Sequence, residues 1–273
     1  MKDILVAIGR TPSSNCAITV AAHLARVHGA RLTALYIPPS QQISPLAIHA
    51  AGPALVDEVA HDRSVLGDQA REYVSSLASS LGIDFQWIEA TGDIIDALVW
   101  HAHCSDIVVV RRWGPQDENG FSSRDFARLV TDAGRPIMII PPSYNGIPGS
   151  SVTIGWNGSR GATRAVHDAL PILRKAKVVE LLIVAATATK SLDKEIALAI
   201  RGHLFRHGIE STPRITVFHP ALGANHMLID TAKTGTDLLV MGAFGRPRIR
   251  EIALGSVTKS VVENSTVPIL LSF

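Results

Sequence analysis

Three glycines and a serine near the end of the sequence have a spacing that could bind an anion. Gly242 follows the apolar run 238–241, and Gly245 comes three residues later. Gly255 and Ser256 follow after a nine-residue connector. A glycine at a strand end permits a positive φ and a close approach of a ligand to the backbone. A serine that begins a helix caps free N–H groups, and these groups attract phosphate together with the helix dipole. The pattern therefore predicts a phosphate-binding segment.

The connector between the glycines is basic. Arg246, Arg248 and Arg250 would place positive charge beside a bound polyphosphate. The spacing is not that of a P-loop, which needs GxxxxGK[ST], and it is not a GxGxxG motif. The alternative interpretation is a glycine-rich strand-to-helix connection that binds nothing, because isolated glycines mostly mark turns.

Histidines and cysteines offer two further candidate clusters. His101, His103 and Cys104 lie one or two residues apart at a predicted helix end, so their side chains do not converge on one face. We interpret them as a helix terminus with a core cysteine, because zinc needs three or four converging ligands. His203 and His207 are four residues apart and could share an ion, but without an HExxH pattern a surface pair is favoured. The sequence predicts no metal site.

Catalytic chemistry has little support in the sequence. Ser13, Ser14 and Ser159 lack the GxSxG elbow of a serine hydrolase. The aspartates at predicted helix starts and strand edges form no obvious general acid and base pair; these are Asp93, Asp96, Asp106 and Asp237. The sequence therefore predicts no catalytic residues.

The composition is that of a globular protein. Of the 273 residues, 47% are hydrophobic and 18% are charged, which excludes a disordered chain and suggests about two domains. The formal charge of +2 and the 5% of aromatic residues argue against a nucleic-acid surface. No apolar run is long enough to span a bilayer, and we expect no membrane partner.

The N-terminus and the cysteines indicate the compartment. Residues 1–6 run directly into a strand pattern, so no signal peptide is expected. Cys16 and Cys104 lie far apart without a CxxC pattern and are predicted to be buried thiols in a reducing cytoplasm.

Apolar runs and helical patterns alternate along the chain, which predicts a parallel, doubly wound α/β sheet. The first set of strands is expected at 4–8, 32–37, 85–89, 107–110 and 137–140, with helices at 15–29, 57–81, 94–102 and 124–133. Residues 141–149 resemble a linker. The second set of strands is expected at 152–156, 178–184, 215–218, 238–241 and 267–271, with helices at 162–173, 192–207, 224–233 and 257–264.

The two sets are an internal repeat. The segment 105–110 (SDIVVV) matches 236–241 (TDLLVM), and 135–139 (RPIMI) matches 267–271 (VPILL) at nearly the same offset. A duplicated five-stranded unit explains the length better than one large sheet.

The glycine spacing resembles the nucleotide motif of the universal stress protein family, G-x2-G-x9-G-[ST], and lies where that family has it, between the fourth strand and the last helix. Each half of the chain looks like one such domain. The resemblance implies two tandem Rossmann-like domains similar to adenine nucleotide alpha hydrolases: a first half, residues 1–142, and a second half, residues 150–273. It further implies an internal pseudo-dimer joined through the two fifth strands, with a further homodimer as an option.

The resemblance also implies a ligand set in the second half. Adenine and ribose would lie between Asn157, Val184 and Met241. Phosphates would meet the backbone and hydroxyl groups of Gly242, Gly245, Gly255, Ser256, Val257 and Thr258, with Arg246 or Arg248 at the outer phosphates. Asn157 stands where the family generally carries an aspartate; it can hydrogen-bond a nucleoside but cannot act as a carboxylate base or metal anchor. It could also be only a turn residue before glycine.

The same motif is degenerate in the first half. Arg111 stands in place of the first glycine, Gly114 keeps the second, and Ser123 and Arg124 occupy the Gly-Ser position. The first strand is followed by Gly9 and Arg10 instead of an aspartate. The first half is therefore predicted to be a structural partner without the usual site.

The function implied by the resemblance is that of a cytoplasmic stress-response regulator. It would bind ATP or a related adenine nucleotide, with or without magnesium, and act on an unidentified protein partner. The alternatives are a nucleotide-free interaction scaffold and, with less support, a slow ATPase.

Overall fold

The structure is a computed structural model of the 273-residue chain. It describes residues 1–8, 16–36, 38, 54–112, 123–185, 191–217, 226, 228–230, 235–243 and 256–273.

The first half forms the strands and helices that the apolar pattern predicts. In chain order they are β1 (Asp3–Ile8), α1 (Cys16–His28), β2 (Arg31–Tyr36), α3 (Ala54–Leu81), β3 (Phe85–Glu89), α4 (Ile94–Ala102), β4 (Ile107–Arg111), α5 (Ser123–Asp132) and β5 (Ile137–Ile140). The bounds agree with the prediction within one or two residues, except that α3 begins three residues earlier.

The second half repeats this order. Its elements are β6 (Ser151–Gly155), α6 (Arg160–Leu173), β7 (Val178–Ala185), α7 (Ser191–Arg206), β8 (Thr212–Val217), β9 (Leu238–Gly242), α9 (Ser256–Asn264) and β10 (Ile269–Ser272). The strand β8 begins three residues before its predicted start. The helix predicted at 224–233 lies mostly outside the described residues, although His226 and 228–230 are helical.

The ten strands in the described part of the chain form one sheet in the order β3-β2-β1-β4-β5-β10-β9-β6-β7-β8. Pairing is parallel within each half, whereas β5 and β10 pair antiparallel, with Leu270 opposite Met138. The two halves therefore meet through their fifth strands, and each strand covers the edge that the other would expose. The expected internal pseudo-dimer is confirmed by this pairing.

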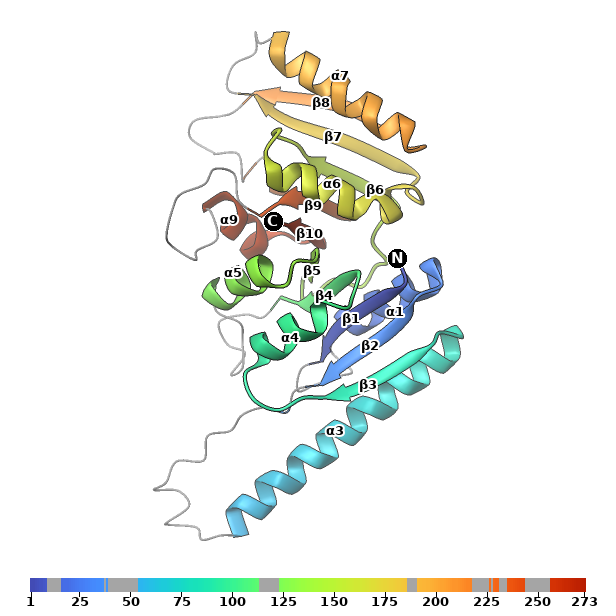
Figure 1. Ribbon diagram of the computed structural model, residues 1–273, viewed down its shortest axis with the longest axis vertical. Helices are drawn as coiled ribbons and strands as arrows, with labels where there is room; N and C mark the ends of the chain where they lie inside the picture. The colour runs from blue at the N-terminus through green and yellow to red at the C-terminus, as the bar shows by residue number, and fades with distance from the viewer. Residues whose placement is uncertain are drawn as a thin grey trace.

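Helices cover both faces of the sheet (Figure 1). Buried side chains of α1, α3, α6 and α7 form one core with one face, and those of α4, α5 and α9 form a second core with the other. The first four residues of the central strands β4 and β9 are all apolar because both faces of these strands are buried. Figure 1 shows β8 and α7 at one end of the long axis and β3 and α3 at the other.

An aspartate beside the fourth strand of each half holds the start of that half's first strand. The Asp237 carboxylate accepts hydrogen bonds from the backbone N–H groups of Gly149 (2.8 Å), Ser150 (2.9 Å) and Ser151 (3.0 Å). Asp106 accepts from the N–H groups of Lys2 and Asp3 in the same way. Both aspartates are thus the strand-edge residues that the sequence predicts.

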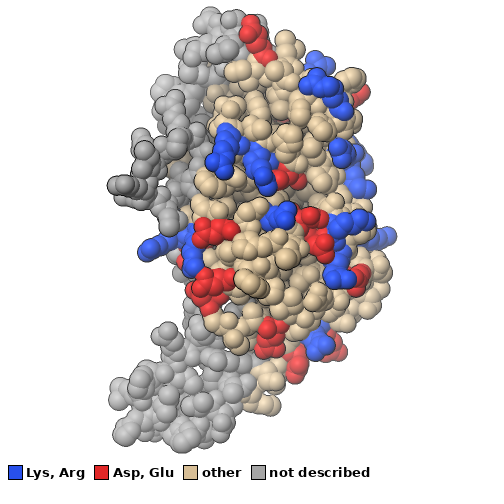
Figure 2. All heavy atoms as spheres, in the orientation of Figure 1, with Lys and Arg blue, Asp and Glu red and all other residues tan. Residues whose placement is uncertain are grey.

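The surface is mixed in charge. Figure 2 shows basic and acidic side chains interspersed over the displayed face, in keeping with the formal charge of +2. In the described part of the chain, no helix combines the length and the apolar character needed to cross a bilayer.

Candidate functional site

The strands β6 and β9 are neighbours at the point where the topology of the second half changes direction. Gly155 at the end of β6 pairs with Met241 near the end of β9. The chain leaves β6 through α6 on one face of the sheet and leaves β9 toward α9 on the other. In open α/β sheets, ligands bind at such a switch point, outside the carboxyl ends of the strands.

Gly242 ends β9 directly against the first turn of α6. A β-carbon added at this position would lie 2.5 Å from the backbone nitrogen of Ala162 and 2.5 Å from the carbonyl carbon of Gly161. Its φ is not positive, so a left-handed turn is not the reason for a glycine here. The glycine is required because another part of the backbone approaches it, and that neighbour is α6.

Asn157 forms the turn between β6 and α6. Its side-chain oxygen accepts a hydrogen bond from the Ser159 N–H at 3.0 Å, and Gly158 follows with a φ of 69°. Ser159 then caps α6 by accepting from the Ala162 N–H at 3.2 Å. The structure therefore shows the turn role of Asn157. Because the residue is exposed, its amide NH₂ group is on the surface beside the switch point.

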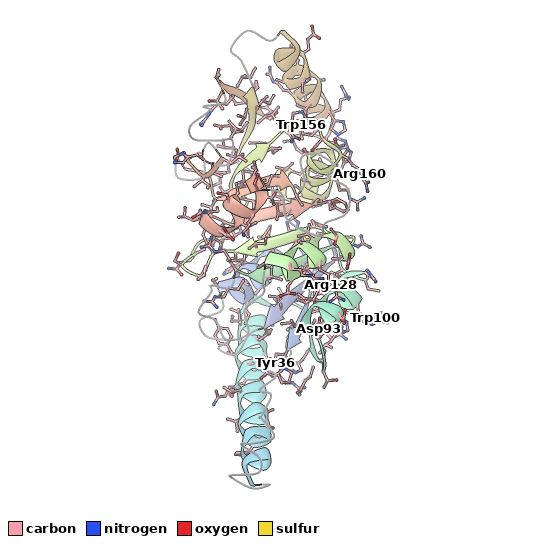
Figure 3. All side chains as sticks on the ribbon, turned by 90° about the vertical axis from the view of Figure 1, so that its left-hand side faces the viewer. Tyr36, Asp93, Trp100, Arg128, Trp156 and Arg160 are labelled. Atoms are coloured by element: carbon pink, nitrogen blue, oxygen red, sulfur yellow. The ribbon has the colours of Figure 1, made fainter. Side chains whose placement is uncertain are left out.

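Val184 and Met241 lie on the same face of the sheet, with the core that includes α9. Met241 is only 6% exposed, and the side chain of Leu228 fills the space beside Gly155, 3.1 Å from where a β-carbon would stand. The floor beside Gly155 is thus apolar. Trp156, labelled in Figure 3, is partly buried and packs against the core on the opposite, α6 side.

The first turn of α9 is joined to the end of β9. The hydroxyl of Thr258, which is 3% exposed, donates a hydrogen bond to the carbonyl of Ala243. Ser256 begins the helix and is exposed, and Val257 is half-buried. The helix N-terminus is therefore held beside β9 with its first residue open to solvent. The remaining predicted ligands lie outside the described residues; they are Gly245, Arg246, Arg248 and Gly255.

In the first half, Arg111 occupies the position equivalent to Gly242, at the end of β4. Its positive charge acts on the Cys16 thiol at the start of α1. Burial raises the pKa of that thiol, and the arginine opposes the rise. The helix α5 begins at Ser123, and Arg124 is exposed. The degenerate positions Gly9, Arg10 and Gly114 lie outside the described residues.

The structure adds a third imidazole to the predicted histidine pair. The His167 ring on α6 lies 5.1 Å from that of His203 and 6.3 Å from that of His207, which are themselves 4.7 Å apart. Burial, followed by the neighbouring histidines and Arg206, lowers the pKa of His203. Within the described ranges, no group of three histidine, cysteine or acidic side chains is arranged to hold a metal ion. No local spacing could have identified His167, because it lies on another helix.

The second candidate cluster is a helix terminus. The helix α4 ends at Ala102 with His103 as its C-cap, as predicted. The expected core cysteine is wrong, because Cys104 lies beyond the cap and is exposed, while Cys16 is half-buried. Both cysteines are free thiols.

A pocket of about 610 Å³ lies on the outer surface of α6. Arg160, Arg164 and Phe273 are among its lining residues, and the Arg160 guanidinium lies 5.5 Å from the centre of the Phe273 ring. Arg160 is labelled in Figure 3. Because Val184 and Met241 face the other side of the sheet, this pocket is separate from the switch-point site.

Comparisons with known proteins agree with this architecture. The sequence model of the universal stress protein family matches residues 151–272. The chain is similar to Universal stress protein Slr1230 of Synechocystis sp., with 23% identity over 227 residues, which cover 79% of this chain and 76% of that protein. A segment of 37 residues is 43% identical to Universal stress protein MJ0577 of Methanocaldococcus jannaschii, covering 14% of this chain and 23% of that protein.

A solved structure extends the similarity to both halves. The crystal structure of a universal stress protein from Archaeoglobus fulgidus aligns with 98% of this chain and 97% of its own, with a TM-score of 0.73 and 17% sequence identity. At that identity the alignment shows the shared fold. The family model shows that the second half, residues 151–272, carries a universal stress protein domain, and the solved structure shows that the fold is shared over both halves.

Proposed function

We propose that the second half binds ATP or a related adenine nucleotide and that the protein acts as a nucleotide-dependent regulator of a stress response in the cytoplasm. The observation that carries the proposal is the switch point, where β9 pairs with the end of β6 and Thr258 joins the first turn of α9 to Ala243 directly after β9. A helix N-terminus held in this way attracts phosphate through its N–H groups and its dipole.

The described residues are compatible with each part of such a ligand. Val184, Met241 and the backbone of Gly155 form an apolar floor for a base, and the Asn157 amide can donate to a nucleoside. Phosphates would meet the N–H groups of Ser256 and Val257 and the glycine segment 242–255, with Arg246 and Arg248 at the outer phosphates. Thr258 would position the helix through Ala243 instead of contacting phosphate.

The test uses a variant that leaves the helix intact. Ser256→Asp places a negative charge at the first residue of α9. There the charge stabilises the helix through its dipole, but it repels phosphate. We expect wild-type protein, stripped by denaturation and refolding, to bind ATP with micromolar affinity by calorimetry, about −8 kcal/mol. We expect Ser256→Asp to weaken ATP binding by more than about tenfold without loss of thermal stability.

The matched control is Ser123→Asp, which changes the first residue of α5 in the first half and should leave ATP affinity unchanged. Anion-exchange analysis of the nucleotide released on denaturation identifies the ligand, and titrations with and without magnesium establish whether the ion contributes. If wild-type protein fails to bind millimolar ATP, the protein is a nucleotide-free scaffold. Turnover of ATP with magnesium would instead make it a slow ATPase.

A further inference from the structure

An arginine of the first half contacts, across the junction of the two halves, the helix that carries the proposed phosphate site. Arg112 follows β4, and its guanidinium donates hydrogen bonds to the carbonyl of Ser265 at 2.7 Å and to the carbonyl of Val262 at 3.0 Å. Val262 lies in the last turn of α9 and Ser265 directly follows the helix. The contacts thus join residues 150 and 153 positions apart in the sequence.

These carbonyls need a partner from outside the helix. The last four carbonyls of an α-helix have no N–H donor within it, and a cation at this end also complements the helix dipole. Val262 is 4% exposed and Ser265 is fully buried, so water cannot easily replace the arginine. Burial lowers the pKa of Arg112 from its ordinary value, yet the group remains charged at any physiological pH.

The contact runs in one direction only. Arg112 and its counterpart Ala243 each follow the fourth strand of their half and donate a backbone N–H, to Ile140 at 2.7 Å and to Ser272 at 2.9 Å. Ala243 has no long side chain that could reach a helix of the first half. The first half therefore holds the second at this point without a reciprocal contact.

The helix α9 thus has an anchor near each end. Thr258 joins its first turn to Ala243 within the second half, and Arg112 of the first half holds its last turn. Figure 1 shows α9 in the middle of the molecule, near β10 at the junction of the halves. With the proposed nucleotide site at the N-terminus of α9, the rigidity of the helix affects how well its N–H groups are preorganised for phosphate.

We propose that Arg112 is a positioning residue through which the first half increases the phosphate affinity of the second half. This inference rests on the proposed nucleotide site. It assigns a role to the first half, whose own motif is degenerate. That half holds the C-terminal end of the phosphate-binding helix α9.

The test compares Arg112→Met and Arg112→Lys with Arg26→Met, which removes an exposed arginine of α1 in the first half. Without nucleotide, hydrogen exchange of the amides of α9 should become at least about tenfold faster in Arg112→Met and remain unchanged in α5. Calorimetry should show about fivefold weaker ATP binding and unchanged adenosine binding, because only the phosphates would contact α9. Arg112→Lys, which keeps the charge, should give an intermediate affinity.

A general loss of structure would weaken ATP and adenosine alike, which would contradict a positioning role. If wild-type protein binds ATP but Arg112→Met binds it equally well, the inference is wrong while the proposed function stands. If wild-type protein does not bind ATP, the proposed function fails and the positioning role fails with it. In that case the exchange data still show whether Arg112 anchors the helix.

Discussion

A β-carbon at Gly242 would lie 2.5 Å from the backbone nitrogen of Ala162, so the end of β9 and the start of α6 meet with no side chain between them. The glycine therefore has a structural role before any ligand is considered. A bulky substitution here would damage the packing of α6, so it could not separate a lost ligand from a lost fold.

Gly242→Ala should destabilise the protein by about 2–3 kcal/mol, because the clash is with backbone that cannot rotate away. Urea unfolding followed by circular dichroism measures this change. The control is Gly202→Ala in α7, where the nearest atom is the mobile Arg206 Nη1 at 3.7 Å and the change should be neutral or slightly stabilising. Equal stability of Gly242→Ala and wild type would contradict the close packing.

Asp237→Ala should cost about 2–3 kcal/mol, because three backbone N–H groups at the start of β6 lose a charged acceptor. Asp237→Asn keeps one oxygen and should lose roughly half as much. The measurement is the free energy of unfolding in urea. Asp84→Ala, which removes an exposed and solvent-screened ion pair with Arg31, should cost much less than Asp237→Ala. A similar cost for both alanine variants would argue against the strand anchor.

The stability should fall when the pH is lowered from 7 to 5, in part because of His28. Burial, then Lys175 and the N-terminal ammonium, lower the pKa of His28 from 6.5 to about 4. The unfolded chain therefore binds a proton at His28 more readily than the folded one. The stability that the folded protein gains from keeping His28 neutral is fully present above pH 6.5 and is lost as the pH falls toward 4.

His28→Gln should reduce this loss, as measured by urea unfolding at the two pH values. His203, whose pKa is also lowered, should maintain part of the dependence. The exposed His61 on α3 provides the control, and His61→Gln should keep the wild-type difference. An unchanged difference in His28→Gln would mean that His28 is not protonated more easily on unfolding.

Leu270→Ala should cost about 2–5 kcal/mol, because the fully buried side chain lies at the β5–β10 junction opposite Met138. Since the sheet is continuous, hydrogen exchange should become faster in β4 of the first half as well as in β9 of the second. Leu198→Ala, at a site 61% exposed on α7, should have little effect. Faster exchange restricted to the second half would indicate that the halves are energetically independent.

The pattern of apolar runs predicted most of the elements. The strands β3 and β5 have the predicted bounds, because their residues are bounded by turn residues and are apolar or amphipathic at strand spacing. The repeat between the segments at 105–110 and 236–241 predicted two similar units, and the resemblance to the family predicted the junction of their fifth strands. Among the strands, the predicted bounds of β8 were the least accurate, since an exposed strand at the edge of the sheet has a weak apolar pattern.

The contacts that define the candidate site depended on the tertiary structure. The spacing of Gly242 and Ser256 identified the segment, but it could not show that α6 packs on Gly242 or that Thr258 donates to Ala243. Arg112 has no local signal, because its partners lie at least 150 residues away and come together only when β5 pairs with β10. The sequence determined the elements and the repeat through short-range hydrophobic patterns. Which side chains meet was decided by the crossover connections between the parallel strands and by the β5–β10 junction, because these bring together residues that are far apart in the sequence.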